Sequence, residues 1–149
     1  MIVLMIDDDD DFRTMAEDWV AEINTVDEDH PQISLVASET PTNFFSSIHN
    51  HKEEERRKIA LIDLSLKGKK SAGLGVLRRI RESEEQRVRL MPAIIYSASD
   101  DDRDVKSSYE KLANSFVWKG NGVDQRKIFT DLLQFWRDTA LTVENLVST

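Results

Sequence analysis

The sequence contains no cysteine, which excludes disulfide bonds and thiolate metal sites. It also lacks any apolar run near the roughly 18 consecutive residues that a membrane-spanning helix needs. No basic leader with a long apolar segment precedes the first apolar run, residues 2–6. Hydrophobic residues nevertheless make up 40% of the 149 residues, enough for a core. We therefore expect a cytoplasmic protein with no membrane partner.

Basic residues are fewer than acidic residues in this sequence. The chain has 20 Lys and Arg residues against 28 Asp and Glu residues, for a formal net charge of −8. Non-specific nucleic-acid binding depends on clustered basic side chains, so we expect no nucleic-acid partner. An acidic balance is otherwise ordinary for a protein surface.

Short apolar runs alternate along the chain with longer segments of helical spacing. The predicted strands are residues 2–6, 33–37, 59–63, 92–96 and 116–118. The predicted helices are residues 12–23, 42–51, 74–84, 102–112 and, longest of all, about 123–146. No linker or internal repeat interrupts this order, which predicts one domain over residues 1–149 with an extended C-terminal helix.

Five strand–helix pairs in strict alternation predict an α/β fold, with a parallel sheet covered by helices on both faces. Right-handed crossovers restrict such a sheet to doubly wound topologies. Ligands bind these folds at the carboxyl ends of the strands. The polar residues that follow each strand are therefore the candidates for function.

Those positions carry a consistent set of chemical groups. Asp7 and Asp8 follow the first strand, Asp63 ends the third, Ser97 follows the fourth and Lys119 follows the fifth. Carboxylates brought close together repel one another unless a cation compensates them, and Mg²⁺ prefers oxygen ligands. An ammonium and a hydroxyl would serve phosphoryl oxygens. The set predicts phosphoryl transfer, in which catalysis is mainly positioning and charge neutralisation.

In this order, and each at a strand end, these residues resemble the receiver domains of bacterial response regulators (CheY-like) over nearly the whole chain. The resemblance implies a flavodoxin-like sheet of order 2-1-3-4-5. It implies that Asp63, in the segment Ile-Ala-Leu-Ile-Asp-Leu-Ser-Leu, accepts a phosphoryl group from a histidine kinase in a two-component phosphorelay with Mg²⁺ as cofactor. Such a chain is a signalling domain that catalyses only its own phosphorylation and dephosphorylation.

The same resemblance assigns further roles. It implies that the main-chain carbonyl of Ser65 binds the metal together with Asp7, Asp8 and Asp63. It also implies that Ser97 and Phe116 are switch residues, which alter the surface formed by the fourth helix, fifth strand and last helix. One departure is Gly120, which follows Lys119 where most receivers have a proline in a cis peptide. Another is a longer and more basic loop over residues 67–73.

The last third of the chain is similar to single-domain regulators of phytochrome-type histidine kinases. The similarity covers residues 104–109 and 114–119, the pair Phe135 and Trp136, and the pair Ala140 and Leu141. Those relatives are commonly homodimers. The apolar stripe along the last helix, with its two aromatic residues, favours a dimer surface over a frayed tail.

Other acidic and histidine groups have simpler interpretations. Asp9–Asp11 and residues 100–104 are predicted to be charged helix caps rather than metal ligands. Thr40, ahead of Pro41, is a further candidate cap. His49 and His51 are two positions apart, so on a helix they would not face each other, and we expect no metal site there.

Two other functions stay open at the level of sequence. A constitutive interaction module would keep the fold without phosphorylation. A Mg²⁺-dependent phosphatase would need a nucleophilic aspartate followed two residues later by a general-acid aspartate. Asp7 and Asp9 fit that spacing, whereas Asp63 is followed at that distance by Ser65.

Overall fold

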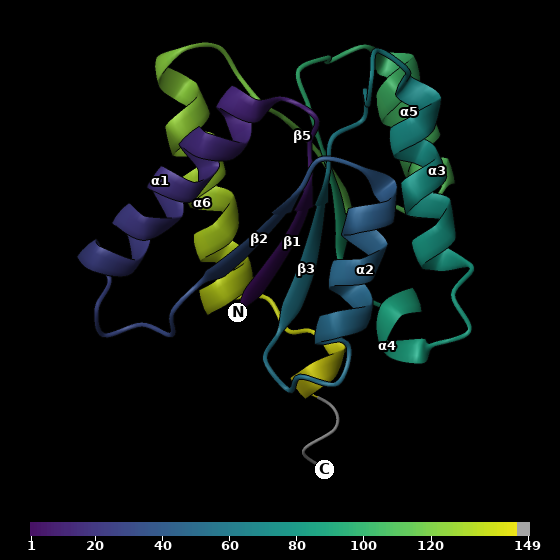
Figure 1. Ribbon diagram of the computed structural model, residues 1–149. Helices are drawn as coiled ribbons and strands as arrows, with labels where there is room; N and C mark the ends of the chain where they lie inside the picture. Colours follow the sequence, from purple (N-terminus) through teal and green to yellow (C-terminus); the bar gives the residue numbers. More distant parts are fainter. Residues whose placement is uncertain (146–149) are drawn as a thin grey trace.

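The computed structural model describes residues 1–145, which fold around one parallel five-stranded sheet (Figure 1). Its strands are β1 (Ile2–Ile6), β2 (Ser34–Ser38), β3 (Lys58–Ile62), β4 (Ala93–Ser97) and β5 (Ser115–Trp118). Their order, β2-β1-β3-β4-β5, confirms the predicted flavodoxin-like, doubly wound arrangement. In the register, Ile6 pairs with both Ser38 and Ile62, so three strands end level with one another. The residues that follow them therefore meet at one edge.

Helices cover both faces of the sheet. They are α1 (Asp10–Val26), α2 (Pro41–His51), α3 (Lys70–Arg81), α4 (Gln86–Arg89), α5 (Asp102–Glu110) and α6 (Val123–Asp138). In Figure 1, α1 and α6 lie on one side of the sheet, and α2, α3 and α5 lie on the other. Successive strand residues point to opposite faces of the sheet and so contribute to two cores. Val3 belongs to the core that includes Phe12 and Phe129, and Leu4 belongs to the core that includes Phe44 and Leu77. No helix among residues 1–145 is long and apolar enough to cross a membrane.

The predicted caps are confirmed at three helices. Asp9 Oδ1 accepts hydrogen bonds from the main-chain N–H groups of Asp11 and Phe12, at 3.0 and 3.3 Å. Thr40 caps α2, and Asp101 accepts from the N–H of Arg103 at 2.8 Å at the start of α5. These side chains satisfy amide groups that a helix leaves unpaired in its first turn.

The C-terminal helix is shorter than predicted. The expected helix over about 123–146 is wrong, because α6 ends at Asp138 and a 3₁₀ turn, Val143–Asn145, follows. Residue 146 lies outside the described residues. The guanidinium of Arg57 donates to the main-chain carbonyls of Ala140 (2.8 Å), Trp136 (3.4 Å) and Arg137. A side chain distant in sequence thus occupies the carbonyls at which the helix ends.

Helices α3 and α4 also differ from the sequence prediction. Helix α3 begins at Lys70 rather than at position 74, and the short helix α4 falls in a segment for which no helix was expected. Four residues are too few for a helical repeat of apolar side chains, which explains why α4 left no signal.

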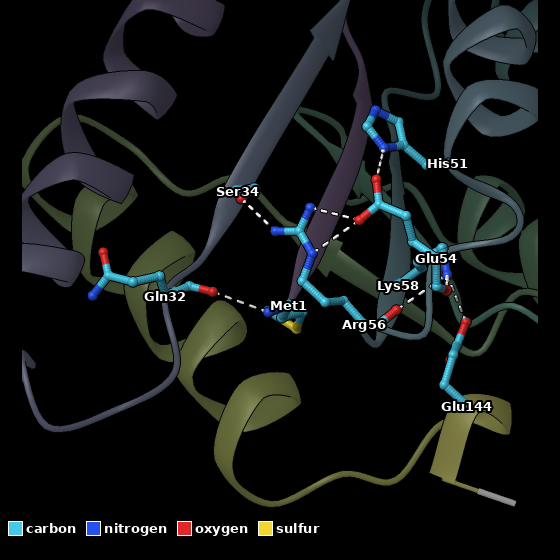
Figure 2. Close-up of polar contacts among 8 residues, drawn as sticks. All are labelled: Met1, Gln32, Ser34, His51, Glu54, Arg56, Lys58 and Glu144. Atoms are coloured by element: carbon cyan, nitrogen blue, oxygen red, sulfur yellow. Dashed lines mark hydrogen bonds and ion pairs between the residues drawn. The ribbon is translucent and has the colours of Figure 1, made fainter. Parts of the chain in front are cut away.

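A polar cluster lies at the end of the sheet opposite the carboxyl ends of the strands (Figure 2). The buried ammonium of Lys58, at the start of β3, donates to the main-chain carbonyls of Glu54 and Arg56 and lies 3.5 Å from Glu144 Oε1. Arg56 binds the Glu54 carboxylate and donates to Ser34 Oγ at 2.9 Å. The contact between Lys58 and Glu144 joins the segment after α6 to the sheet.

Candidate functional site

Three carboxylates meet at the carboxyl edge of the sheet. Asp7, Asp8 and Asp63 each offer a ligand oxygen, and these oxygens lie within 4.8 Å of one another. We call these three residues the acidic cluster. Main-chain hydrogen bonds continue the sheet past its strands and fix their backbone: Asp7 N donates to Ser38 O at 3.1 Å, and Asp63 N donates to Ile6 O at 3.0 Å. The cluster is therefore held by the sheet itself.

Lys119 supplies the only ammonium that is paired with the cluster among the described residues. Its main-chain N–H donates to the carbonyl of Ser97 at 2.7 Å, directly after β5. Its ammonium lies 2.6 Å from Asp7 Oδ2 and 3.6 Å from Asp63 Oδ1, and it stands 4.2 Å from the ring centre of Phe12. The aromatic ring and the two acids fix its position.

The charges at this edge do not cancel. Burial raises the pKa of Asp63 from its ordinary value of 3.8 to about 7; the carboxylates of Asp7 and Asp8 add to that rise, and Lys119 opposes it. Three carboxylates against one ammonium leave an excess of negative charge when all are ionised. A divalent cation with oxygen ligands would remove that excess, so the donor set fits Mg²⁺ or a similar hard cation.

Asp8 is oriented by the loop that follows β3. Its Oδ2 accepts a hydrogen bond from the main-chain N–H of Lys67 at 2.7 Å. Lys67 and Gly68 both have positive φ, 53° and 73°, which turns the chain sharply at this point. The basic loop noted in the sequence thus contacts the acidic cluster through its backbone, while the Lys67 side chain is exposed.

Helix α3 approaches this loop so closely that only glycine fits at one position. A Cβ atom on Gly73 would lie 2.3 Å from the carbonyl oxygen of Leu64 and 2.5 Å from that of Asp63. The Gly73 N–H donates to the Leu64 carbonyl at 3.1 Å. Gly73 therefore positions the backbone of Asp63. The sequence analysis missed this role, because it placed Gly73 in the loop before the predicted helix over 74–84.

The remaining predicted site residues are Ser97, Phe116 and Ser65. The buried hydroxyl of Ser97 accepts a hydrogen bond from the N–H of Ser99 at 3.1 Å, and none joins it to Asp63 among the described residues. Phe116 packs partly buried against the core on the α2, α3 and α5 side. Ser65 lies in the loop two residues after Asp63, and its carbonyl as a metal ligand stays a prediction.

The departure at Gly120 has a structural reason. Its φ is 77°, and a Cβ there would lie 2.6 Å from Ile128 Cδ1. Glycine lets the chain turn from Lys119 towards α6 without this clash. No peptide bond among the described residues is cis.

Comparison with known proteins identifies the fold. No protein-family model matches the sequence, and no curated protein matches it either. Solved structures do match. The Mn²⁺-bound form of the response regulator Rcp1 is 20% identical, with a TM-score of 0.72 over 95% of this chain and 97% of that one. The phosphorylated cyanobacterial phytochrome response regulator RcpA is 18% identical, with a TM-score of 0.77 over 95% and 96%. The chain has the receiver-domain fold.

A third structure with the receiver fold belongs to red light signalling. The response regulator RPA3017 of R. palustris is 19% identical, with a TM-score of 0.73 over 95% of this chain and 98% of that one. The predicted resemblance to receiver domains, phytochrome-associated ones among them, is therefore confirmed at the level of structure. At these identities the likeness establishes the fold, and chemistry has to be argued from the site.

Proposed function

We propose that this chain is a single-domain response regulator that accepts a phosphoryl group on Asp63 from a histidine kinase in a Mg²⁺-dependent reaction. The observation that supports this most is the meeting of the acidic cluster with the Lys119 ammonium at the carboxyl edge of a receiver fold. In this proposal the chain consists of one receiver domain, acts in the cytoplasm and is not an enzyme with a separate substrate.

Asp63 is the nucleophile in this proposal. One of its carboxylate oxygens attacks the phosphorus of a phosphohistidine; the new P–O bond forms as the P–N bond breaks, and the imidazole nitrogen keeps the electron pair. Mg²⁺, held by the acidic cluster and the Ser65 carbonyl, would neutralise charge on the phosphoryl oxygens. Lys119 is already 3.6 Å from Asp63, so its ammonium can pair with one of those oxygens.

Phosphorylation of Asp63 would then change a surface away from the site itself. The phosphoryl group adds negative charge and acceptor oxygens, to which Ser97 donates. Phe116 fills the space that Ser97 leaves, and this alters the surface of α5, β5 and α6, the elements predicted as the fourth helix, fifth strand and last helix. That surface exposes Tyr109, Trp118 and Phe135, with relative exposures of 49%, 39% and 50%. Exposed aromatic side chains favour an interface, and we propose homodimerisation there.

The names of two structural neighbours support a phytochrome-type kinase as the phosphoryl donor. RcpA is a cyanobacterial phytochrome response regulator, and RPA3017 acts in red light signalling. The similarity in the last third of the sequence points the same way.

The phosphatase alternative is less favourable. It requires the Asp9 carboxyl group as a general acid, but Asp9 Oδ1 accepts two main-chain hydrogen bonds at the start of α1. The Asp9 side chain is thus engaged as the N-terminal cap of α1. The interaction module without phosphorylation would not need a buried ammonium beside Asp63, so the pair with Lys119 favours the phosphoacceptor.

Intact-protein mass spectrometry tests the proposal. Incubation with Mg²⁺ and acetyl phosphate should add one phosphoryl group to the wild type, and EDTA or Asp63→Asn should abolish the gain. Asp100→Asn is a matched control, because Asp100 is an exposed acid outside the acidic cluster. A wild type that gains no mass, or an undiminished gain in Asp63→Asn, would refute it.

A further inference from the structure

A chain of hydrogen bonds runs from the start of α3 to Ser97, at the end of β4. The ammonium of Lys70 lies 2.6 Å from Asp104 Oδ2, near the start of α5. The same carboxylate oxygen accepts a hydrogen bond from the hydroxyl of Ser99 at 2.9 Å. Helices α3 and α5 lie on the same side of the sheet, and this contact joins their N-terminal ends (Figure 1).

Ser99 connects the Asp104 carboxylate to Ser97. Its main-chain N–H donates to Ser97 Oγ at 3.1 Å, and its own hydroxyl accepts from the N–H of Asp101 at 3.2 Å. The loop between β4 and α5 is thus folded around two serine hydroxyls, one of which is anchored by Asp104. On the β5 side the indole N–H of Trp118 donates to the carbonyl of Ala98 at 3.2 Å.

The ion pair between Lys70 and Asp104 is partly exposed to solvent. The Asp104 side chain is 15% exposed, whereas that of Lys70 is 50% exposed. The hydrogen bond from Lys70 lowers the pKa of Asp104, with a smaller contribution from Ser99, so the carboxylate stays charged at neutral pH. Pairs that are this open to solvent contribute modestly to stability and can be exchanged for other partners.

The link holds Ser97 in one particular arrangement. In it the Ser97 hydroxyl oxygen accepts a hydrogen bond from the loop that follows β4, and none joins it to Asp63 among the described residues. We propose that Lys70, Asp104 and Ser99 form a loop latch that stabilises this resting arrangement and so weakens binding of a phosphoryl group at Asp63. Lys70 and Asp104 are positioning residues in this proposal, which rests on the proposed function. Breaking the latch lowers the cost of moving Ser97 and shifts the population towards the phosphoryl-binding arrangement.

Beryllofluoride with Mg²⁺ is a suitable probe, since it activates the receiver domain of DrrB, a structural neighbour of this chain. Its affinity is measured by isothermal titration calorimetry for the wild type, Lys70→Gln, Asp104→Asn and Ser99→Ala. Lys70→Gln makes the chain more negative and Asp104→Asn makes it less negative, so a purely electrostatic effect would move their affinities in opposite directions. Glu110→Gln is the matched control, because it removes an exposed acid from the same helix.

The latch predicts the same sign for all three variants. Each should bind beryllofluoride about two- to fivefold more tightly, as expected for loss of a partly exposed ion pair. The double variant Lys70→Gln with Asp104→Asn should gain no more than either single variant. Thermal unfolding, recorded in parallel, identifies any variant that has lost its fold.

The possible outcomes separate the two proposals. Opposite shifts for Lys70→Gln and Asp104→Asn, or unchanged affinity in folded variants, would overturn the latch and leave the proposed function standing. A wild type that binds no beryllofluoride would overturn the proposed function, and the latch with it.

Discussion

The ammonium of Lys119 lies 3.6 Å from a carboxylate oxygen of Asp63, although β4 separates the strands that carry the two residues. The side chain reaches across one strand to Asp63 and across a second to Asp7, at 2.6 Å. One buried cation thus compensates part of the charge of three acids that follow two different strands. In the proposed function, this arrangement would couple metal binding to phosphoryl transfer.

Replacing this lysine should separate the two activities. Lys119→Gln removes a positive charge from the acidic cluster, so Mg²⁺ should bind several-fold more tightly at pH 8. The phosphoryl oxygens lose their ammonium partner, so phosphorylation by acetyl phosphate should slow at least about tenfold. Calorimetry and intact mass measure the two effects. Lys106→Gln, on the exposed surface of α5, should change neither, and weaker Mg²⁺ binding in Lys119→Gln would contradict the account.

The raised pKa of Asp63 has a consequence for stability. In the unfolded chain this carboxyl ionises near pH 3.8, and in the metal-free folded protein near pH 7. Ionised Asp63 therefore destabilises the fold, a cost that grows as the pH rises from about 4 and is complete above about 7. In EDTA, Asp63→Asn should be more stable than the wild type at pH 8, by on the order of 2–4 kcal/mol.

Urea unfolding with EDTA at several pH values checks this sign. The advantage of Asp63→Asn should shrink as the pH falls from 7 towards 4, because the wild-type carboxyl then becomes neutral in both states. Asp100→Asn should show no such trend. A variant less stable than the wild type at pH 8 would contradict the inference that ionised Asp63 destabilises the fold.

Most of the sheet and the site could be predicted from the sequence, because both depend on local patterns. Apolar runs predict the strands. Parallel strands that end level with one another bring the residues that follow them to one edge of the sheet. Asp9 was correctly predicted as a helix cap from its place before an amphipathic segment. The meeting of the three acids of the acidic cluster followed from their places at strand ends.

The missed end of α6 involves contacts between distant parts of the chain. Helix α6 ends at Asp138, and the side chain of Arg57, far away in sequence, binds main-chain carbonyls at this end. Nothing in the apolar stripe along that segment records such a partner. The ion pair between Lys70 and Asp104 could not be predicted for the same reason, since these residues meet only in the folded chain.

Gly73 offers a direct test of how the phosphoacceptor is positioned. In Gly73→Ala the new methyl group would clash with the carbonyls of Leu64 and Asp63, so the free energy of unfolding should fall by about 1–3 kcal/mol. Mg²⁺ affinity should fall as well, because the backbone of Asp63 has to shift. Gly75→Ala is the matched control on the same helix; its Cβ meets no atom within 4 Å, and it should stabilise the protein by up to about 1 kcal/mol. Equal effects of the two substitutions would contradict this role.

The buried pair at the opposite end of the sheet should matter for stability alone. Lys58→Met leaves the Glu144 carboxylate buried without its ammonium, and we expect a loss of about 1–3 kcal/mol in urea unfolding. Lys127→Met breaks an exposed pair with Asp131 on α6 and should cost no more than about 0.5 kcal/mol. Mg²⁺ affinity should be unchanged in both. A Lys58→Met variant as stable as the wild type would show that this pair does not anchor the segment after α6.

The most direct measurement of the central claim is the position of the phosphoryl group itself. After phosphorylation with acetyl phosphate and Mg²⁺, borohydride reduces the acyl phosphate to an alcohol, and tandem mass spectrometry of the peptides locates the reduced side chain. The account predicts that the mark falls on Asp63 alone. A mark on Asp7, as the phosphatase alternative requires, or no mark on any aspartate, would contradict it.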